Sequence, residues 1–228
     1  MGKNDNGNNG RTELVFVVDR SGSMGGLESD AIGGFNSMLS KQRTIAGECR
    51  VTTLLFDHRI ETLHNYLDIR EVNDLTSRDY WVRGSTALLD AIGLAIDRMI
   101  VTQRHTAAAY RAQHVLFVII TDGYENASRR YSLHQIKQMI TYERERYHWE
   151  FVFLGANIDA EQTAGDFGIS PRCATDFHAD GQGIKASFEA VACAATAVRG
   201  GADLDDLSAP DFLGGVRDDY RSRRRMKR

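Results

Sequence analysis

The feature that most constrains the fold is an apolar run near the start of the chain that ends at an aspartate. Residues 14–18 (Leu-Val-Phe-Val-Val) are all apolar, and Asp19 follows directly. A short run of this length and β-branched content is typical of a buried parallel strand. Open α/β sheets bind their ligands at the carboxyl edge of the strands, so Asp19 is expected to lie where a ligand would bind.

Two serines follow this aspartate in alternation, Ser21 and Ser23. Together with Asp19 they supply one carboxylate and two hydroxyls within a short loop. Such an all-oxygen set suits a hard divalent cation such as Mg²⁺. The competing interpretation is that Ser21 or Ser23 caps the helix that begins near Met24. A cap needs one such residue rather than three in alternation, which favours the metal.

Strand and helix patterns alternate along most of the chain. Further strands are predicted at 51–56, 115–121 and 151–155, with a short one near 173–177, and helices at 27–42, 87–99, 132–147, 159–167 and 184–198. The segment 59–67 follows a tight turn and alternates in polarity, so it is expected to pair antiparallel with 51–56. The alternation predicts an α/β fold with a mostly parallel sheet covered by helices on both faces.

Two further stretches place oxygen-bearing side chains at strand ends or helix starts. Gly84-Ser85-Thr86 precedes a predicted helix, and Thr121-Asp122-Gly123 ends an apolar strand just as Asp19 does. Taken alone, Thr86 could be a helix N-cap and Asp122 part of an Asp-Gly turn. The order of the three stretches along the chain makes a shared site the stronger interpretation.

In this order the three stretches resemble the metal-ion-dependent adhesion site of von Willebrand factor type A (VWA) domains. The resemblance covers residues 12–200 and implies a Rossmann-like three-layer sandwich with one antiparallel edge strand. It also implies that a metal ion is held by five residues: Asp19, Ser21, Ser23, Thr86 and Asp122. The general layout is similar to that of intracellular bacterial or phage members of the family.

The chemistry of this ligand set points to binding rather than catalysis. Two carboxylates would neutralise a dication, and three hydroxyls would leave its coordination incomplete, because Mg²⁺ takes about six oxygen ligands. The resemblance implies that a partner Asp or Glu fills the open position. Mn²⁺ would serve equally, and Ca²⁺ is an alternative. No base such as histidine lies within the three loops to generate a nucleophile, so we expect a divalent-metal-dependent protein-binding module and no enzyme.

Two other functions stay open at this point. A Mg²⁺-dependent phosphatase of the haloacid-dehalogenase type also places an aspartate after its first strand, but it needs a second carboxylate two residues later, where this chain has Ser21. A nucleic-acid-associated role could use the basic C-terminus, and its affinity would fall steeply with salt. For the protein-binding function, we expect Tyr124, Glu125 and Asn126 to make the variable partner contacts, because they directly follow Asp122-Gly123.

Composition sets the remaining expectations. The three cysteines are scattered and the polar start of the chain lacks the apolar core of a signal peptide, so we expect a cytoplasmic protein without a membrane span, monomeric by itself. Residues 1–11 are expected to be a disordered leader and 201–228 a C-terminal extension. The net charge is −3, yet residues 217–228 carry seven basic and two acidic residues. Because periodicity fades after residue 203, we expect this basic tail to be loosely docked or disordered.

Overall fold

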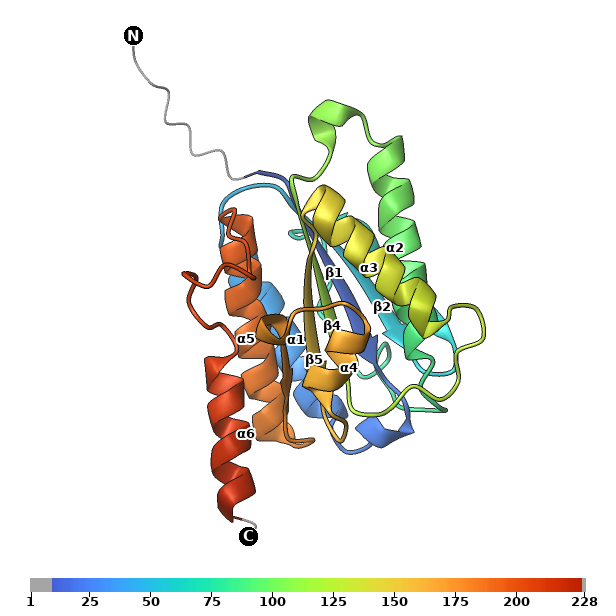
Figure 1. Ribbon diagram of the computed structural model, residues 1–228, viewed down its shortest axis with the longest axis vertical. Helices are drawn as coiled ribbons and strands as arrows, with labels where there is room; N and C mark the ends of the chain where they lie inside the picture. The colour runs from blue at the N-terminus through green and yellow to red at the C-terminus, as the bar shows by residue number, and fades with distance from the viewer. Residues whose placement is uncertain (1–9, 227–228) are drawn as a thin grey trace.

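The computed structural model describes residues 10–226, which form a six-stranded sheet flanked by helices (Figure 1). The strands are β1 (Thr12–Asp19), β2 (Cys49–Phe56), β3 (Ile60–Asp68), β4 (His114–Thr121), β5 (Glu150–Gly155) and β6 (Ala174–Asp176). The α-helices are α1 (Glu28–Arg43), α2 (Leu88–His105), α3 (Leu133–Tyr147), α4 (Ala160–Asp166), α5 (Gly181–Arg199) and α6 (Gly214–Met226). Three short 3-10 turns, η1 (Gly22–Met24), η2 (Ala108–Tyr110) and η3 (Pro171–Cys173), complete the elements.

The sheet has the order β3-β2-β1-β4-β5-β6. Every neighbouring pair is parallel except β2 and β3, whose hairpin makes β3 an antiparallel edge strand. The chain first moves from β1 to β2 on one side and later continues at β4 on the other side. The predicted Rossmann-like sandwich with one antiparallel edge strand is therefore confirmed.

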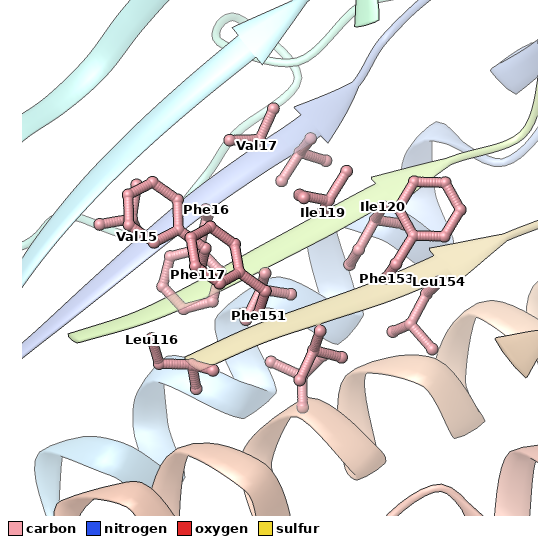
Figure 2. Packing of buried hydrophobic residues seen from close by; sticks show 14 of the residues in the cluster. Val15, Phe16, Val17, Leu116, Phe117, Ile119, Ile120, Phe151, Phe153 and Leu154 are labelled. Carbon is pink, nitrogen blue, oxygen red and sulfur yellow. The ribbon is translucent and has the colours of Figure 1, made fainter. Parts of the chain in front are cut away.

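The helices form a layer on each face of the sheet. Helices α1 and α5 pack against each other on one face, and α2 and α3 pack together on the other (Figure 1). All residues of β1 are buried, as a central strand covered on both faces requires. Large apolar side chains from β1, β4 and β5 fill the layers on both faces (Figure 2), and the rings of Phe117 and Phe151 stack with their centroids 4.9 Å apart.

The expectation of a loosely docked tail was wrong for the described part of the C-terminus. Helix α6 packs against α5 and β6, with Leu213 and Val216 buried at its start. Arg217 donates hydrogen bonds to the carbonyl oxygens of residues 171, 172 and 174 at 3.0–3.1 Å. Arg223 pairs with Asp180 at 2.6 Å. The density of basic residues misled the prediction, because these cations find carbonyl and carboxylate partners on the domain.

The predicted leader lies mostly outside the described residues, since residues 1–9 are not among them; of the leader's last two residues, Arg11 forms an ion pair with Glu48. Within residues 10–226, no helix is long and apolar enough to cross a membrane.

Candidate metal centre

The carboxyl ends of β1 and β4 meet at the point where the strand order reverses. β1 ends at Asp19, and Asp122 directly follows the last residue of β4. The chain leaves β1 toward α1 on one face and leaves β4 toward α3 on the other face. Ligand-binding crevices of open α/β sheets form where two neighbouring strands diverge in this way. The topology therefore brings the two predicted carboxylates to one crevice.

Asp19 is fully buried and held by hydrogen bonds from both strands. Its Oδ1 accepts from the backbone N–H of Ser21 at 2.7 Å, and its Oδ2 accepts from the hydroxyl of Thr121 at 2.6 Å. Burial raises the pKa of the Asp19 carboxyl, and these hydrogen bonds oppose that rise. Asp19 is thus fixed in orientation before any ligand arrives.

The two serine hydroxyls connect the first loop to Asp122. The Ser21 and Ser23 oxygens lie 3.0 Å apart, and the Ser23 hydroxyl donates to Oδ1 of Asp122 at 2.5 Å. Ser21 occupies the N-cap position of η1 without making a side-chain cap hydrogen bond, and the N-cap of α1 is Leu27. The capping interpretation of these serines is therefore wrong, and both hydroxyls face the crevice.

Thr86 belongs to the same cluster. It is buried, it is not the N-cap of α2, and the N-cap residue Ala87 makes no side-chain cap hydrogen bond. A Cβ built on Gly123 would lie 3.4 Å from the Ser23 hydroxyl oxygen and 3.6 Å from that of Thr86. Because both hydroxyls approach Gly123, the second loop reaches the same crevice as the first.

One carboxylate oxygen of Asp122 is left without a partner in this cluster. Its Oδ2 is buried and has no hydrogen-bond partner among the described residues, whereas its Oδ1 accepts from Ser23. Burial raises the pKa of the Asp122 carboxyl to about 6, against the lowering effect of the Ser23 hydrogen bond and with help from the negative charge of Asp19. An orphaned buried carboxylate oxygen beside a second carboxylate is a situation that a cation relieves.

The donor set therefore fits a hard divalent cation: two carboxylates at the ends of the neighbouring strands β1 and β4 and three hydroxyls, all oxygen. Among the described residues, no cluster of three or more His, Cys, Asp or Glu side chains could hold a metal ion. The candidate cluster has only two carboxylates, and its other side-chain oxygens are hydroxyls.

The three residues expected to contact a partner occupy different environments. Tyr124 is 61% exposed. Glu125 turns back to the protein, where its carboxylate accepts from the backbone N–H groups of Leu89 and Ser128 at 2.9 and 2.7 Å. Asn126 exchanges hydrogen bonds with the backbone of Thr86 at 2.9 and 3.0 Å. Glu125 and Asn126 thus fasten the third loop to the second, and partner contact by all three residues stays a prediction.

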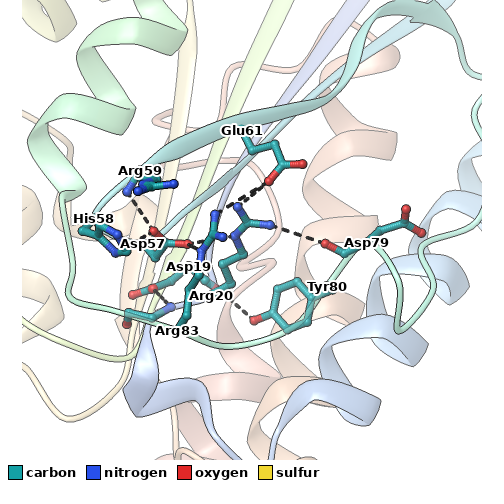
Figure 3. A network of polar contacts seen from close by, with 10 residues as sticks. Asp19, Arg20, Asp57, His58, Arg59, Glu61, Asp79, Tyr80 and Arg83 are labelled. Atoms are coloured by element: carbon teal, nitrogen blue, oxygen red, sulfur yellow. Dashed lines mark hydrogen bonds and ion pairs between the residues drawn. The ribbon is translucent and has the colours of Figure 1, made fainter.

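A buried ionic network beside the crevice was missed by sequence reasoning (Figure 3). Arg20 is fully buried, and its Nε lies 3.1 Å from Oδ2 of Asp57, which also accepts from Nε of Arg83 at 2.8 Å. Tyr80 donates its hydroxyl proton to the carbonyl oxygen of Asp19 at 2.6 Å. The one signal in the sequence was Arg20 itself, a cation between Asp19 and Ser21. Arginine in such a loop is normally exposed to solvent, so its burial was not expected.

The network and the backbone hydrogen bonds beside it fix the first and second loops relative to each other. The backbone N–H of Arg83 donates to the carbonyl of Arg20 at 3.0 Å, and that of Gly22 donates to the carbonyl of Gly84 at 3.1 Å. Gly84 has a φ of +66°, and a Cβ there would lie 2.0 Å from the His58 ring, so glycine is required at this position. Ser23 and Thr86 are therefore positioned by contacts that do not involve the hydroxyls themselves.

These features define a class of protein: an α/β sandwich that gathers acidic and hydroxyl side chains at its topological switch point. No protein-family model and no curated protein matches the sequence. Among solved structures, the chain is similar to proximal thread matrix protein 1 from the mussel byssus, with 14% identity over 82% of this chain and 46% of that one, and a TM-score of 0.55. The same protein has been solved with a zinc-occupied MIDAS motif.

A second similar structure is manganese-loaded TRAP protein from Plasmodium vivax, with 18% identity over 78% of this chain and 72% of that one, and a TM-score of 0.56. This chain spans less than half the length of the byssus protein. At these identities the likeness concerns the fold. The chain has the von Willebrand factor type A fold, as its sequence resemblance indicated.

Proposed function

We propose that this chain binds a divalent metal ion through Asp19, Ser21, Ser23, Thr86 and Asp122, and through that ion binds a protein partner that presents an Asp or Glu. The buried, unpartnered Oδ2 of Asp122 beside Asp19 is the observation that carries the proposal. The byssus protein and TRAP support it, since they share the fold and have been solved with zinc and manganese.

The ion would supply a positive charge at the carboxyl edge of the sheet, where this chain's own residues are arranged to hold it. The two carboxylates balance a dication's charge. The hydroxyls of Ser21, Ser23 and Thr86 add neutral oxygens. Since Mg²⁺ prefers about six oxygens, five protein ligands leave room for a water molecule or an incoming carboxylate. A carboxylate that replaces this water would bring the partner's charge to the ion, which favours acidic partners.

A binding role fits the chain better than phosphatase chemistry. The residue two positions after Asp19 is Ser21, whose hydroxyl lies 3.0 Å from that of Ser23 and is no general acid at neutral pH. The nucleic-acid alternative rests on the basic tail, of which Arg221 and Arg224 are exposed on α6. Mg²⁺ as the native ion, a monomeric state, a cytoplasmic location and a bacterial or phage origin stay predictions.

Metal binding is tested by calorimetric titration of Mg²⁺ and Mn²⁺ into the full chain. We expect one site in the wild type and loss of binding by at least about tenfold in Asp122→Ala, because half of the anionic charge is removed. Asp218→Ala is the matched control, since Asp218 is an exposed carboxylate on α6. In EDTA, Asp122→Ala should unfold at the same urea concentration as the wild type or a higher one, because it relieves repulsion from Asp19.

The open coordination position is tested with Mn²⁺-loaded protein and acetate. Mn²⁺ with an exchangeable water accelerates the relaxation of bulk water protons, and acetate should reduce that acceleration as it replaces the water. Absence of metal binding, or binding unchanged in Asp122→Ala, would contradict the proposed site. Metal binding without any acetate effect would instead contradict the open position.

A further inference from the structure

An exposed tryptophan stacks against two arginines of the ionic network beside the candidate metal centre. Trp81 lies in the segment 69–87 between β3 and α2, which also carries Thr86, and it is 43% exposed. The guanidinium carbon of Arg83 lies 4.3 Å from the centroid of its ring, and that of Arg20 lies 5.5 Å away. Such stacking between a cation and an aromatic ring is attractive and holds the indole in place.

Both arginines under the indole are themselves fixed. Arg20 is fully buried between Asp57 and Glu61, with 3.1 and 2.5 Å contacts to their carboxylates, and Arg83 donates to Asp57 at 2.8 Å. Movement of either guanidinium group would remove one of the donors of the buried Asp57 carboxylate. An aromatic side chain that is rigid before binding loses little entropy when a partner covers it.

The tryptophan is also tied to the loop that carries the candidate ligands. Arg20 directly follows Asp19, and its carbonyl accepts from the backbone N–H of Arg83. Tyr80, the neighbour of Trp81, donates to the carbonyl of Asp19 at 2.6 Å. Trp81 is thus adjacent in sequence to the residue that contacts Asp19, and it belongs to the segment that is bonded to the first loop.

The charge around this surface favours an acidic partner. Arg20 and Arg83 are paired with the carboxylates of Asp57 and Glu61. The Arg59 side chain is exposed at the tip of the β2–β3 hairpin (Figure 3) and makes no ion pair within the described part of the chain. Asp79 also borders this network, so the preference for an acidic partner rests on Arg59, whose charge is paired with no carboxylate of the described residues.

We propose that Trp81, Arg83 and Arg59 form a docking surface for an acidic segment of a protein partner that carries a large apolar or aromatic side chain close to its metal-binding carboxylate. This inference rests on the proposed function and names the kind of partner that the site accepts. The indole would cover the apolar side chain, and the arginines would meet further acidic groups of the segment.

The test is selection of a random-peptide display library on the immobilised full chain, in Mg²⁺ and in EDTA. Peptides retained only in Mg²⁺ should contain an Asp or Glu with an aromatic or large aliphatic residue within about two positions, the reach of neighbouring side chains along an extended strand. The same selection on Trp81→Ala should still retain acidic peptides but lose the apolar preference. A selected peptide should bind Trp81→Ala about fivefold more weakly or worse, the loss typical of a significant interface residue.

Two further variants keep the result interpretable. Trp81→Phe should restore most of the affinity, and Tyr142→Ala, which removes a 55% exposed tyrosine on α3, should leave it unchanged. Mn²⁺ affinity of Trp81→Ala should stay within about twofold of the wild type, because this variant removes no ligand. A larger loss would show that Trp81 only supports the metal loop and would overturn the docking surface.

The outcomes separate the docking surface from the proposed function. Mg²⁺-dependent acidic peptides without an apolar preference would overturn the docking surface alone. Absence of any Mg²⁺-dependent peptide, in a chain that binds Mg²⁺, would overturn both. Mg²⁺-dependent dimerisation that is lost in Trp81→Ala would assign the surface to a second copy of this chain and would also overturn the proposal.

Discussion

Two buried polar clusters lie side by side at the carboxyl edge of this sheet, and they differ in how their charges are balanced. Around Asp57, every carboxylate oxygen has a donor: Oδ2 meets Arg20 and Arg83, and Oδ1 meets the backbone of Arg59. Around Asp122, a second carboxylate is near and one oxygen has no partner. The balanced cluster is complete without a ligand, whereas the unbalanced one is not, and this distinguishes scaffold from site.

The pKa directions of the two aspartates reflect the same contrast. Burial pushes the pKa of Asp57 upward, but hydrogen bonds from Arg83 and Arg59 and the charge of Arg20 hold it below its usual value. Burial raises the pKa of Asp122 to about 6 with no cation to oppose it. The protein therefore stabilises the charge of Asp57 by itself, whereas the charge of Asp122 is the one that the proposed metal ion would balance.

The largest expected effect comes from breaking the balanced cluster. Asp57→Ala would leave the fully buried Arg20 without its buried counter-charge, and we expect a loss of about 4 kcal/mol in the free energy of unfolding, measured by urea denaturation. Glu61→Gln is the control, because Glu61 is 59% exposed and its loss should cost less than about 1 kcal/mol. A similar small loss for Asp57→Ala would remove the distinction between the two clusters.

A smaller loss of stability is expected when the C-terminal helix α6, whose arginines have partners on the domain, is removed. Truncation after Gly215 removes the buried Val216 and the three hydrogen bonds that Arg217 donates to carbonyls. We expect the free energy of unfolding to fall by about 3 kcal/mol. Arg221→Ala, at an exposed position on the same helix, should change stability by less than about 0.5 kcal/mol. An unchanged melting temperature after truncation would restore the expectation of a loosely docked tail.

The third prediction concerns a buried carboxylate that has an unpartnered oxygen but lies outside the candidate metal centre. Glu13, near the opposite end of β1, is buried with one unpartnered oxygen, and burial raises its pKa to about 8 against the charge of Arg50. Because this pKa is raised on folding, the folded protein holds the proton longer, and stability should be lost as pH rises from about 4.5 to 8.

Glu13→Gln removes this titration. Above pH 8 the variant should be more stable than the wild type by at least about 2 kcal/mol, and the difference should shrink toward pH 5. Urea denaturation at several pH values measures it, and a difference independent of pH would contradict the assignment to Glu13. Glu13 has an unpartnered oxygen like Asp122, yet within residues 10–226 no serine or threonine hydroxyl donates to it, so an orphaned carboxylate indicates a candidate site only where further oxygens converge.

Much of the fold and of the candidate ligand set was predictable from the sequence. The apolar runs that end at Asp19 and Asp122 placed both carboxylates at one sheet edge, since parallel strands end together. The assignment of Thr86 to the candidate ligand set depended on the order of the three stretches, because Thr86 taken alone is also compatible with a helix N-cap. The Arg20–Asp57 pair could not be predicted, since it joins residues 37 positions apart and breaks the rule that arginine stays solvated.

The prediction for the C-terminal segment was wrong for a related reason. Sequence periodicity indicates an apolar face, but α6 docks largely through arginines whose partners lie on other elements. Arg217 and Arg223 bond to groups more than 40 positions away, and nothing local predicts those partners. Long-range polar contacts are specified by the assembled fold, so a single sequence without aligned relatives does not reveal them.

The way Glu125 and Asn126 turn inward has a consequence for how binding preference can diversify. Their side chains hold α2 and Thr86 in place, while Tyr124, between them and the glycine, points outward with 61% of its surface exposed. A substitution at position 124 would therefore leave the hydrogen bonds of Glu125 and Asn126 in place. If the proposed function holds, a lineage of such proteins, or an engineer, could change the preferred partner at this single residue and keep the metal-binding residues unaltered.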